Sequence, residues 1–249
     1  RELYTFFWNE FCDWYIEFSK SRLDEGNDSA DRLACQRNLM FVLGQAISLL
    51  HPIMPFVTEE IYQELPFDRS KADYLIGAAW PVAADLAKYK NDDAERAIDM
   101  VCETVTAIRA TRARYRLSPK TPLAVLVKAD AGDVDLLFAQ SQLIEAMANT
   151  ESFGVASDAQ KPEASTVALC SGFEVYIILA GLVDFEAERA RLTKELAKLE
   201  ADCAKLDKKL SNPGFLAKAA PEIIEKDTAK RDEIADKAAR VKEQLADLA

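Results

Sequence analysis

The side chains best suited to chemistry form a run of cations in an otherwise acidic chain. The 249 residues carry 31 Lys and Arg against 42 Asp and Glu, a net charge of −11. Residues 104–129 nevertheless contain no acid and six basic residues, which are Arg109, Arg112, Arg114, Arg116, Lys120 and Lys128. Guanidinium groups match phosphate geometry with paired donors. An acidic protein that holds a polyanion would concentrate its positive charge in this way.

The spacing of three of these arginines predicts a shared helix face. Arg109, Arg112 and Arg116 follow i, i+3, i+7 in a segment that we expect to be helical to Arg116. We predict that this face, with Lys120 just beyond it, contacts RNA phosphate. A solvated helix surface would give the same spacing, but the absence of acids over 26 residues favours polyanion contact.

Other residue types have weaker claims to a site. Trp8 and Trp14 could stack on RNA bases, although aromatic residues at helical spacing more commonly form a core. His51, the one histidine, precedes Pro52 at an expected helix end, and the sequence offers it no catalytic or metal-binding partners. We therefore expect His51 to have a capping or packing role.

The cysteines and the missing motifs argue against catalysis. Five cysteines lie far apart with no CxxC pair, which makes a zinc site unlikely to form and fits reduced thiols in a cytosol. No glycine-rich phosphate loop, nucleophile elbow or metal signature occurs. The sequence predicts no catalytic residue, no bound metal and no cofactor in this chain.

The cation run must be positioned by an expected helical bundle over residues 1–116. Helices are predicted up to Leu23, from Ser29 to His51, after Pro55, and over 92–116. Their apolar stripes are typical of antiparallel helices in a bundle. Residues 39–57 lack charge, but their Gln45 and prolines indicate a buried bundle helix and no membrane span. The pattern starts at Arg1 without a cap, so we expect a fragment of a longer protein.

The spacing of apolar residues changes twice after the predicted bundle. Over 117–182, β-rich segments at 123–128, 151–156, 165–170 and 173–179 flank a helical pattern at 133–147, which predicts a small α+β subdomain. Over 183–249, apolar residues recur at intervals of three and four on either side of a Pro- and Gly-containing break at 211–221. This pattern predicts an antiparallel coiled-coil hairpin that projects, with arms of about 27 residues each. The fold class is therefore mainly α.

Several segments resemble a known family. Residues 7–20 (FWNEFCDWYIEFSK), 49–65 (LLHPIMPFVTEEIYQEL) and 108–119 (IRATRARYRLSP) resemble the anticodon-binding helical domain of class I aminoacyl-tRNA synthetases of the valine, isoleucine and leucine group. Residues 181–200 and 212–227 resemble the coiled-coil arm of the bacterial valine enzymes. Isoleucine enzymes typically end in a zinc-bearing module, which the cysteine spacing here cannot supply.

The resemblance implies a tRNA-binding role. The bundle would dock the anticodon stem-loop of tRNA(Val), and the arm would lie against the tRNA elbow. Arg109, Arg112, Ser118 and Pro119 match the family pattern R-x-x-R-x-x-x-x-x-S-P. The arm offers four lysines near its tip for contact with the RNA backbone, namely Lys205, Lys208, Lys209 and Lys218. The chain itself would catalyse nothing, and the parent enzyme would use ATP with Mg²⁺.

The resemblance also sets the expected cellular context and leaves alternatives. We expect a cytoplasmic monomer that binds neither DNA nor membrane. The chain could instead be the equivalent part of an isoleucyl or leucyl enzyme. It could also be a non-catalytic scaffold whose hairpin binds a partner protein. Strongly salt-dependent binding of a polyanion would distinguish a tRNA-binding module from such a scaffold.

Overall fold

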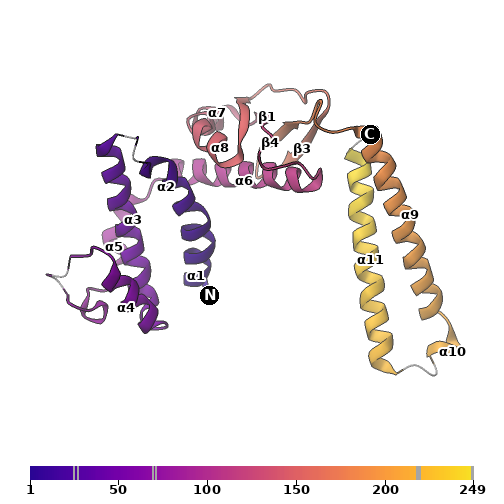
Figure 1. Cartoon of the computed structure of the whole chain (residues 1–249), viewed down its shortest axis with the longest axis horizontal. Helices are drawn as coiled ribbons and strands as arrows, with labels where there is room; N and C mark the ends of the chain where they lie inside the picture. Colours follow the sequence, from indigo (N-terminus) through magenta and orange to yellow (C-terminus); the bar gives the residue numbers. More distant parts are fainter. Residues whose placement is uncertain (25, 27, 69, 71, 217–219, 248–249) are drawn as a thin grey trace. The chain divides into compact units, whose positions relative to one another are not determined.

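We describe a computed structural model of the chain, in which residues 1–249 are described except for 25, 27, 69, 71, 217–219 and 248–249 (Figure 1). The chain divides into two compact units. One comprises residues 1–159 with 169–175, and the other comprises 160–168 with 176–249. The fold is mainly helical with a small four-stranded sheet, as predicted from the sequence.

The first helix is continuous but changes its winding. It consists of α1 (Glu2–Thr5), the ten-residue π-helix η1 (Phe6–Tyr15) and α2 (Ile16–Leu23). Aromatic rings four residues apart lie against one another along it, with centroids 5.6–6.3 Å apart. The predicted end at Leu23 is confirmed, whereas no feature of the sequence pattern predicts the wide π segment.

The remaining bundle helices begin close to where the sequence predicts. Helix α3 (Ser29–Leu50) is capped by Asp28, whose carboxylate accepts the Ala30 N–H at 3.3 Å. Helix α4 (Pro55–Glu64) has proline at its start, where the missing N–H costs nothing. Three short helices follow in the expected loop, which are η2 (Leu75–Gly77), α5 (Ala83–Leu86) and η3 (Ala87–Tyr89).

Helix α3 is long and apolar enough to cross a membrane by length and composition. It buries Cys35, Ala46, Ile47 and Leu50 within the bundle. It also contacts α2 and α4. These contacts show that α3 packs within the bundle, where 22% of its most apolar 18-residue window is buried.

Helix α6 (Asp92–Arg114) joins the bundle to the α+β segment. Its buried stripe runs from Ala97 to Arg112 and packs on α7 and α8 (Figure 1). Side chains spaced along α6 add polar links. The Arg96 guanidinium pairs with buried Asp133 at 2.6 Å, and the Glu103 carboxylate accepts the Ser171 N–H at 2.7 Å. Helix α6 thus supports the α+β segment. It packs chiefly on α7 and α8, so the prediction that it forms a fourth antiparallel helix against α3 and α4 is wrong.

The sheet has strand order β2-β1-β4-β3. Its strands are close to the predicted segments, and they are β1 (Leu123–Lys128), β2 (Thr150–Ala156), β3 (Ser165–Leu169) and β4 (Glu174–Ile178). Strands β1 and β2 are parallel, with a register shift between Leu123 and Ala124. Gly154 does not interrupt β2, because it pairs opposite Leu126, whose Cδ1 would lie 3.3 Å from an added Cβ. The left-handed Gly172 (φ 92°) turns the chain from β3 into β4.

The single helix expected over 133–147 is wrong. The structure has two short helices, α7 (Ala131–Phe138) and α8 (Ser141–Ala148). The Gln140 N–H turns back to the Leu137 carbonyl at 3.0 Å, and the Gln140 carbonyl then accepts the Ile144 N–H as a new helix begins. Apolar spacing continues across this break, which is why the period alone does not reveal it.

The predicted hairpin is confirmed. Helices α9 (Phe185–Leu210) and α11 (Pro221–Asp247) pack side by side, with the one-turn helix α10 (Pro213–Leu216) between them in sequence (Figure 1). Asp184 caps α9 by accepting the Ala187 N–H at 3.0 Å. Leu192, Ala238 and Val241 are the buried residues of the seam.

The half of the hairpin near the α9–α11 connection has polar residues in its seam. Half-buried Asp227, Thr228 and Arg231 occupy seam positions of α11 there. Ion pairs cross between the helices, with Lys209–Asp227 at 2.7 Å and Arg231–Asp207 at 3.3 Å. The seam is therefore mixed here: these partly exposed ion pairs, which salt screens, accompany half-buried Leu206, Leu210 and Ile224.

Candidate nucleic-acid interface

The predicted arginine face is interrupted where α6 ends. The helix stops at Arg114, and Arg116 has a left-handed backbone with φ 54°. The Leu117 N–H bonds to the Arg112 carbonyl at 2.9 Å, and the Arg116 N–H bonds to that of Ala113 at 3.3 Å. This is a Schellman motif with arginine at the position that glycine usually takes. The prediction that Arg116 shares a helix face with Arg109 and Arg112 is therefore wrong.

Arg112 also departs from its predicted role, because it is only 6% exposed. Its Nη1 donates to the carbonyls of Ser118 at 3.0 Å and Thr121 at 2.5 Å. Its Nη2 donates to those of Ala148 at 2.9 Å and Asn149 at 3.0 Å. Burial lowers the pKa of this guanidinium from its usual value, yet an arginine stays charged at neutral pH. Four carbonyl dipoles therefore hold its charge, and it is not presented to solvent for phosphate.

The sequence did carry a signal for this burial. Position 112 lies four residues after Ile108 and seven after Val105, both of which are fully buried. The apolar stripe of α6 therefore continues directly onto Arg112. The arginine spacing and the apolar stripe overlap at position 112, and the stripe decides its burial.

Three of the predicted cations remain at the surface. Arg109, Arg116 and Lys120 are exposed. Arg116 and Lys120 belong to residues 115–121, which we call the basic turn. Arg109 lies on α6 five residues before the helix ends at Arg114, and its Nη2 reaches the Met147 carbonyl at 3.4 Å. All three side chains are accessible to solvent, so each can attract phosphate.

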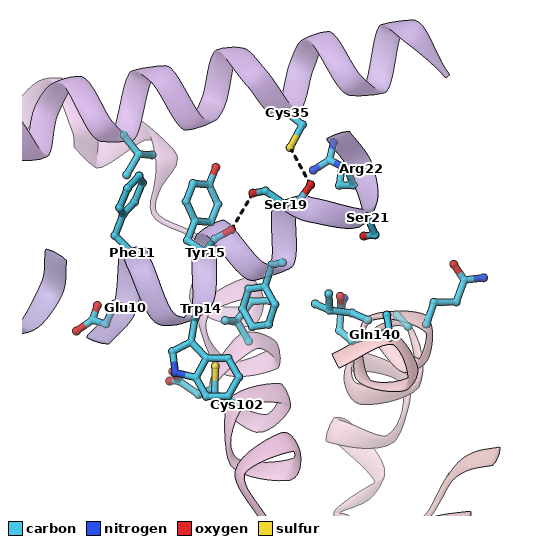
Figure 2. Close-up of a pocket in the computed structure, with 18 of the residues that line it drawn as sticks. Glu10, Phe11, Trp14, Tyr15, Ser19, Ser21, Arg22, Cys35, Cys102 and Gln140 are labelled. Carbon is cyan, nitrogen blue, oxygen red and sulfur yellow. Dashed lines mark hydrogen bonds between the residues drawn. The ribbon is translucent and has the colours of Figure 1, made fainter. Parts of the chain in front are cut away.

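A pocket of about 840 Å³ opens beside the aromatic side chains of η1 (Figure 2). Residues of η1, α2, α3, α6 and the α7–α8 region line it, and Trp14 forms part of its wall. The Arg109 guanidinium lies 5.5 Å from the Trp14 ring centroid, a cation–π contact. Ser19 and Cys35 are tied to neighbouring backbone carbonyls at its upper edge in Figure 2. The pocket thus combines an aromatic wall with a nearby cation.

The two predicted stacking residues differ in their surroundings. Trp14 is half-buried and packs against Phe18, with ring centroids 5.6 Å apart. Trp8 is 55% exposed and stacks in near-parallel fashion on Tyr4 at 6.3 Å. The core interpretation therefore does not hold for Trp8, whose ring presents a large aromatic surface to solvent.

His51 has the local role that the sequence predicts. Its Nδ1 lies 2.8 Å from the Thr58 Oγ1, and that hydroxyl donates to the Met54 carbonyl at 2.8 Å. Thr58 is 1% exposed. The contact joins the end of α3 to the first turns of α4 across the intervening prolines.

The thiols have environments that disfavour reactivity. Burial, with the Asp99 charge nearby, raises the pKa of Cys102 to about 11. Burial and the Glu103 charge likewise raise the pKa of Cys170 to about 11. Neither thiol is a thiolate at neutral pH, and nucleophilic chemistry requires the thiolate.

The hairpin lysines are unequally available. Lys205 pairs with Asp202 at 2.8 Å on the same helix. Lys209 pairs across the hairpin with Asp227 and lies 4.7 Å from the Phe215 ring centroid. Lys208 is exposed, and within the described part of the chain its ammonium pairs with no acidic group. Lys218 lies outside the described residues.

Comparison with known proteins gives the family. Residues 1–127 match the family described as the anticodon-binding domain of tRNA ligase, and residues 184–249 match the valyl tRNA synthetase tRNA binding arm. The chain is 35% identical over 249 residues, its full length, to a valine--tRNA ligase of Enterococcus faecalis. It is 39% identical over 242 residues, 96% of its length, to that of Nitratidesulfovibrio vulgaris.

These relatives are much longer than the chain. The matches span 28% of the Enterococcus protein and 26% of the Nitratidesulfovibrio protein. The arm match distinguishes the valine enzymes from the isoleucine and leucine enzymes that the sequence analysis left open. The chain therefore belongs to the valyl-tRNA synthetase family, of which it carries the anticodon-binding domain and the tRNA-binding arm.

Proposed function

We propose that this chain is the tRNA-binding part of a valine--tRNA ligase and that it holds tRNA(Val) on two surfaces. The first surface docks the anticodon stem-loop through Arg109, Arg116 and Lys120. Trp14 and Trp8 supply faces on which unpaired bases can stack. The observation that carries this proposal is the group of exposed cations in a 26-residue window without acids, within a family defined by anticodon binding.

The second proposed surface is the hairpin. Lys208 is its most available cation, and Lys205 can turn from an exposed pair with Asp202 to phosphate at little cost. We assign Lys209 a mixed role, because its pair with Asp227 stabilises the connection between the helices. The hairpin would lie along the tRNA elbow and would add contacts that an isolated stem-loop cannot offer.

The cellular setting follows from the family as a proposal. Charging of tRNA(Val) with valine would use ATP and Mg²⁺ at a catalytic domain outside this sequence. The protein would act in the cytoplasm as a monomer, where the five free thiols stay reduced.

A titration against purified tRNA species with different anticodons tests the proposal. We expect tRNA(Val) to bind most tightly, with an affinity that falls steeply as KCl rises. The Arg116→Ala/Lys120→Ala variant should bind more weakly, while Lys161→Ala, which removes an exposed lysine elsewhere, should bind as the unaltered chain does. Equal affinity for all the tRNA species would contradict an anticodon-docking role.

A further inference from the structure

We propose that Arg112 is a positioning residue, which fixes the basic turn in its RNA-binding conformation without touching RNA. The inference rests on the proposed function, because it takes Arg116 and Lys120 as the phosphate-binding groups. It replaces the direct contact that arginine spacing suggests with an indirect role from beneath the surface.

The guanidinium bridges two segments that are far apart in sequence. Its Nη1 donates hydrogen bonds to the carbonyls of Ser118 and Thr121 in the basic turn. Its Nη2 serves the end of α8 through the carbonyls of Ala148 and Asn149. One buried side chain therefore ties the turn to the start of β2.

A second tie holds the same turn. Asn149 has a left-handed backbone with φ 51°, and its Nδ2 donates to the Pro119 carbonyl at 3.0 Å. Within the turn, the Thr121 N–H bonds to the Ser118 carbonyl at 3.0 Å, and the Ser118 Oγ accepts the Lys120 N–H at 3.2 Å. The backbone beneath the two cations is therefore ordered before any ligand arrives. Preorganisation of this kind reduces the ordering entropy lost on binding.

Only arginine has the geometry for this bridge. A guanidinium offers five N–H donors in a fixed plane, so its two Nη atoms can serve two segments at once. A lysine ammonium is a single point that cannot reach all four carbonyls. Arg112→Lys therefore keeps the charge and removes the bridge, which separates positioning from attraction.

The experiment measures the affinity of the full chain for a tRNA(Val) transcript over a KCl series. Arg116→Ala/Lys120→Ala should reduce the magnitude of the log–log salt slope by about 1.4–1.8, since each phosphate contact contributes roughly 0.7–0.9. Arg112→Lys should weaken binding by about fivefold or more, because two cationic side chains must then be ordered on binding. Its slope should fall toward that of the double variant although the net charge is unchanged.

Two further variants make the result decisive. Adding Arg112→Lys to the double variant should cause little extra loss, because Arg112 acts through the residues already removed. Glycine adopts the left-handed backbone of position 149 without strain, so Asn149→Gly removes the hydrogen bond to the Pro119 carbonyl. This variant should therefore also weaken tRNA binding, as Arg112→Lys does. It also serves as the test if circular dichroism shows that Arg112→Lys does not fold.

The outcomes separate the inference from the proposed function. If the double variant binds tRNA as the unaltered chain does, the basic turn is not the RNA contact and both ideas fail. If the double variant loses affinity while Arg112→Lys and Asn149→Gly bind normally, the positioning role alone is overturned. Full additivity of Arg112→Lys with the double variant would also overturn it, because it would indicate a direct contact.

Discussion

At the scale of single residues, the unusual feature is an arginine in a position suited to glycine. Arg116 ends α6 with φ 54°, a conformation that costs a side chain-bearing residue roughly 1–2 kcal/mol. Strained backbone that persists is often associated with function. Here the strained backbone conformation places the Arg116 cation in the basic turn.

Replacement of Arg116 by glycine should weaken tRNA binding and raise the stability of the fold. We expect Arg116→Gly to raise the free energy of unfolding by about 1 kcal/mol, the relieved strain less the entropy that glycine loses on folding. The same change should weaken tRNA binding. Urea unfolding and a tRNA titration measure the two effects. Arg116→Ala is the control, since it should lose affinity without gaining stability, and equal stability of the two variants would refute the strain argument.

The half-buried thiol of Cys102 predicts a loss of stability at alkaline pH. The pKa of Cys102 is about 11 in the folded chain and near 9.0 when unfolded, so the folded state favours the protonated thiol. Its contribution is fully present below pH 9 and is lost as pH rises toward 11. Urea unfolding at pH 8 and pH 10.5 should therefore show a smaller alkaline loss for Cys102→Ala than for the unaltered chain. An identical loss in both would show that this thiol does not contribute.

At the scale of elements, the hairpin is the most easily tested part. Leu199 is half-buried in the seam, whereas Ala204 on the same helix is exposed. We expect Leu199→Asp to reduce helicity at 222 nm and to weaken binding of whole tRNA, because it places an unpaired carboxylate in the seam. Ala204→Asp adds the same charge to the solvent face and should change neither. Similar behaviour of the two variants would mean that the seam does not maintain the hairpin.

Long periodic elements were predictable, and their ends and irregularities were not. The heptad spacing of α9 and α11, on either side of a break with proline and glycine, predicted the hairpin, because each helix has one apolar stripe to bury. The same reasoning extended α6 two residues too far, since a Schellman end with arginine lacks the usual glycine signal. It also merged α7 and α8, whose break has no proline and no glycine.

The candidate site was predictable in composition but not in arrangement. The acid-free window contains three exposed cations, Arg109, Arg116 and Lys120, whose role in binding stays a prediction. Burial of Arg112 depends on carbonyls from residues 118–121 and 148–149, which meet only in the folded chain. Lys209 likewise pairs with Asp227 across the hairpin, a contact that no local pattern indicates.

At the scale of the whole molecule, the chain should bind without catalysis. The sequence contains no glycine-rich phosphate loop and no nucleophile elbow, and it spans about a quarter of its relatives. We expect no valine-dependent ATP–pyrophosphate exchange by the pure chain. Exchange above the level of a matched blank preparation would contradict this expectation.

Binding on two surfaces is tested most directly by comparing a whole tRNA(Val) transcript with its isolated anticodon stem-loop. The affinity of the unaltered chain for each RNA would be measured over a KCl series. We predict tighter binding and a steeper salt dependence for the whole tRNA, because the hairpin adds phosphate contacts at the elbow. Equal affinity and equal slope for the two RNAs would contradict the second surface, and binding that KCl does not weaken would contradict both.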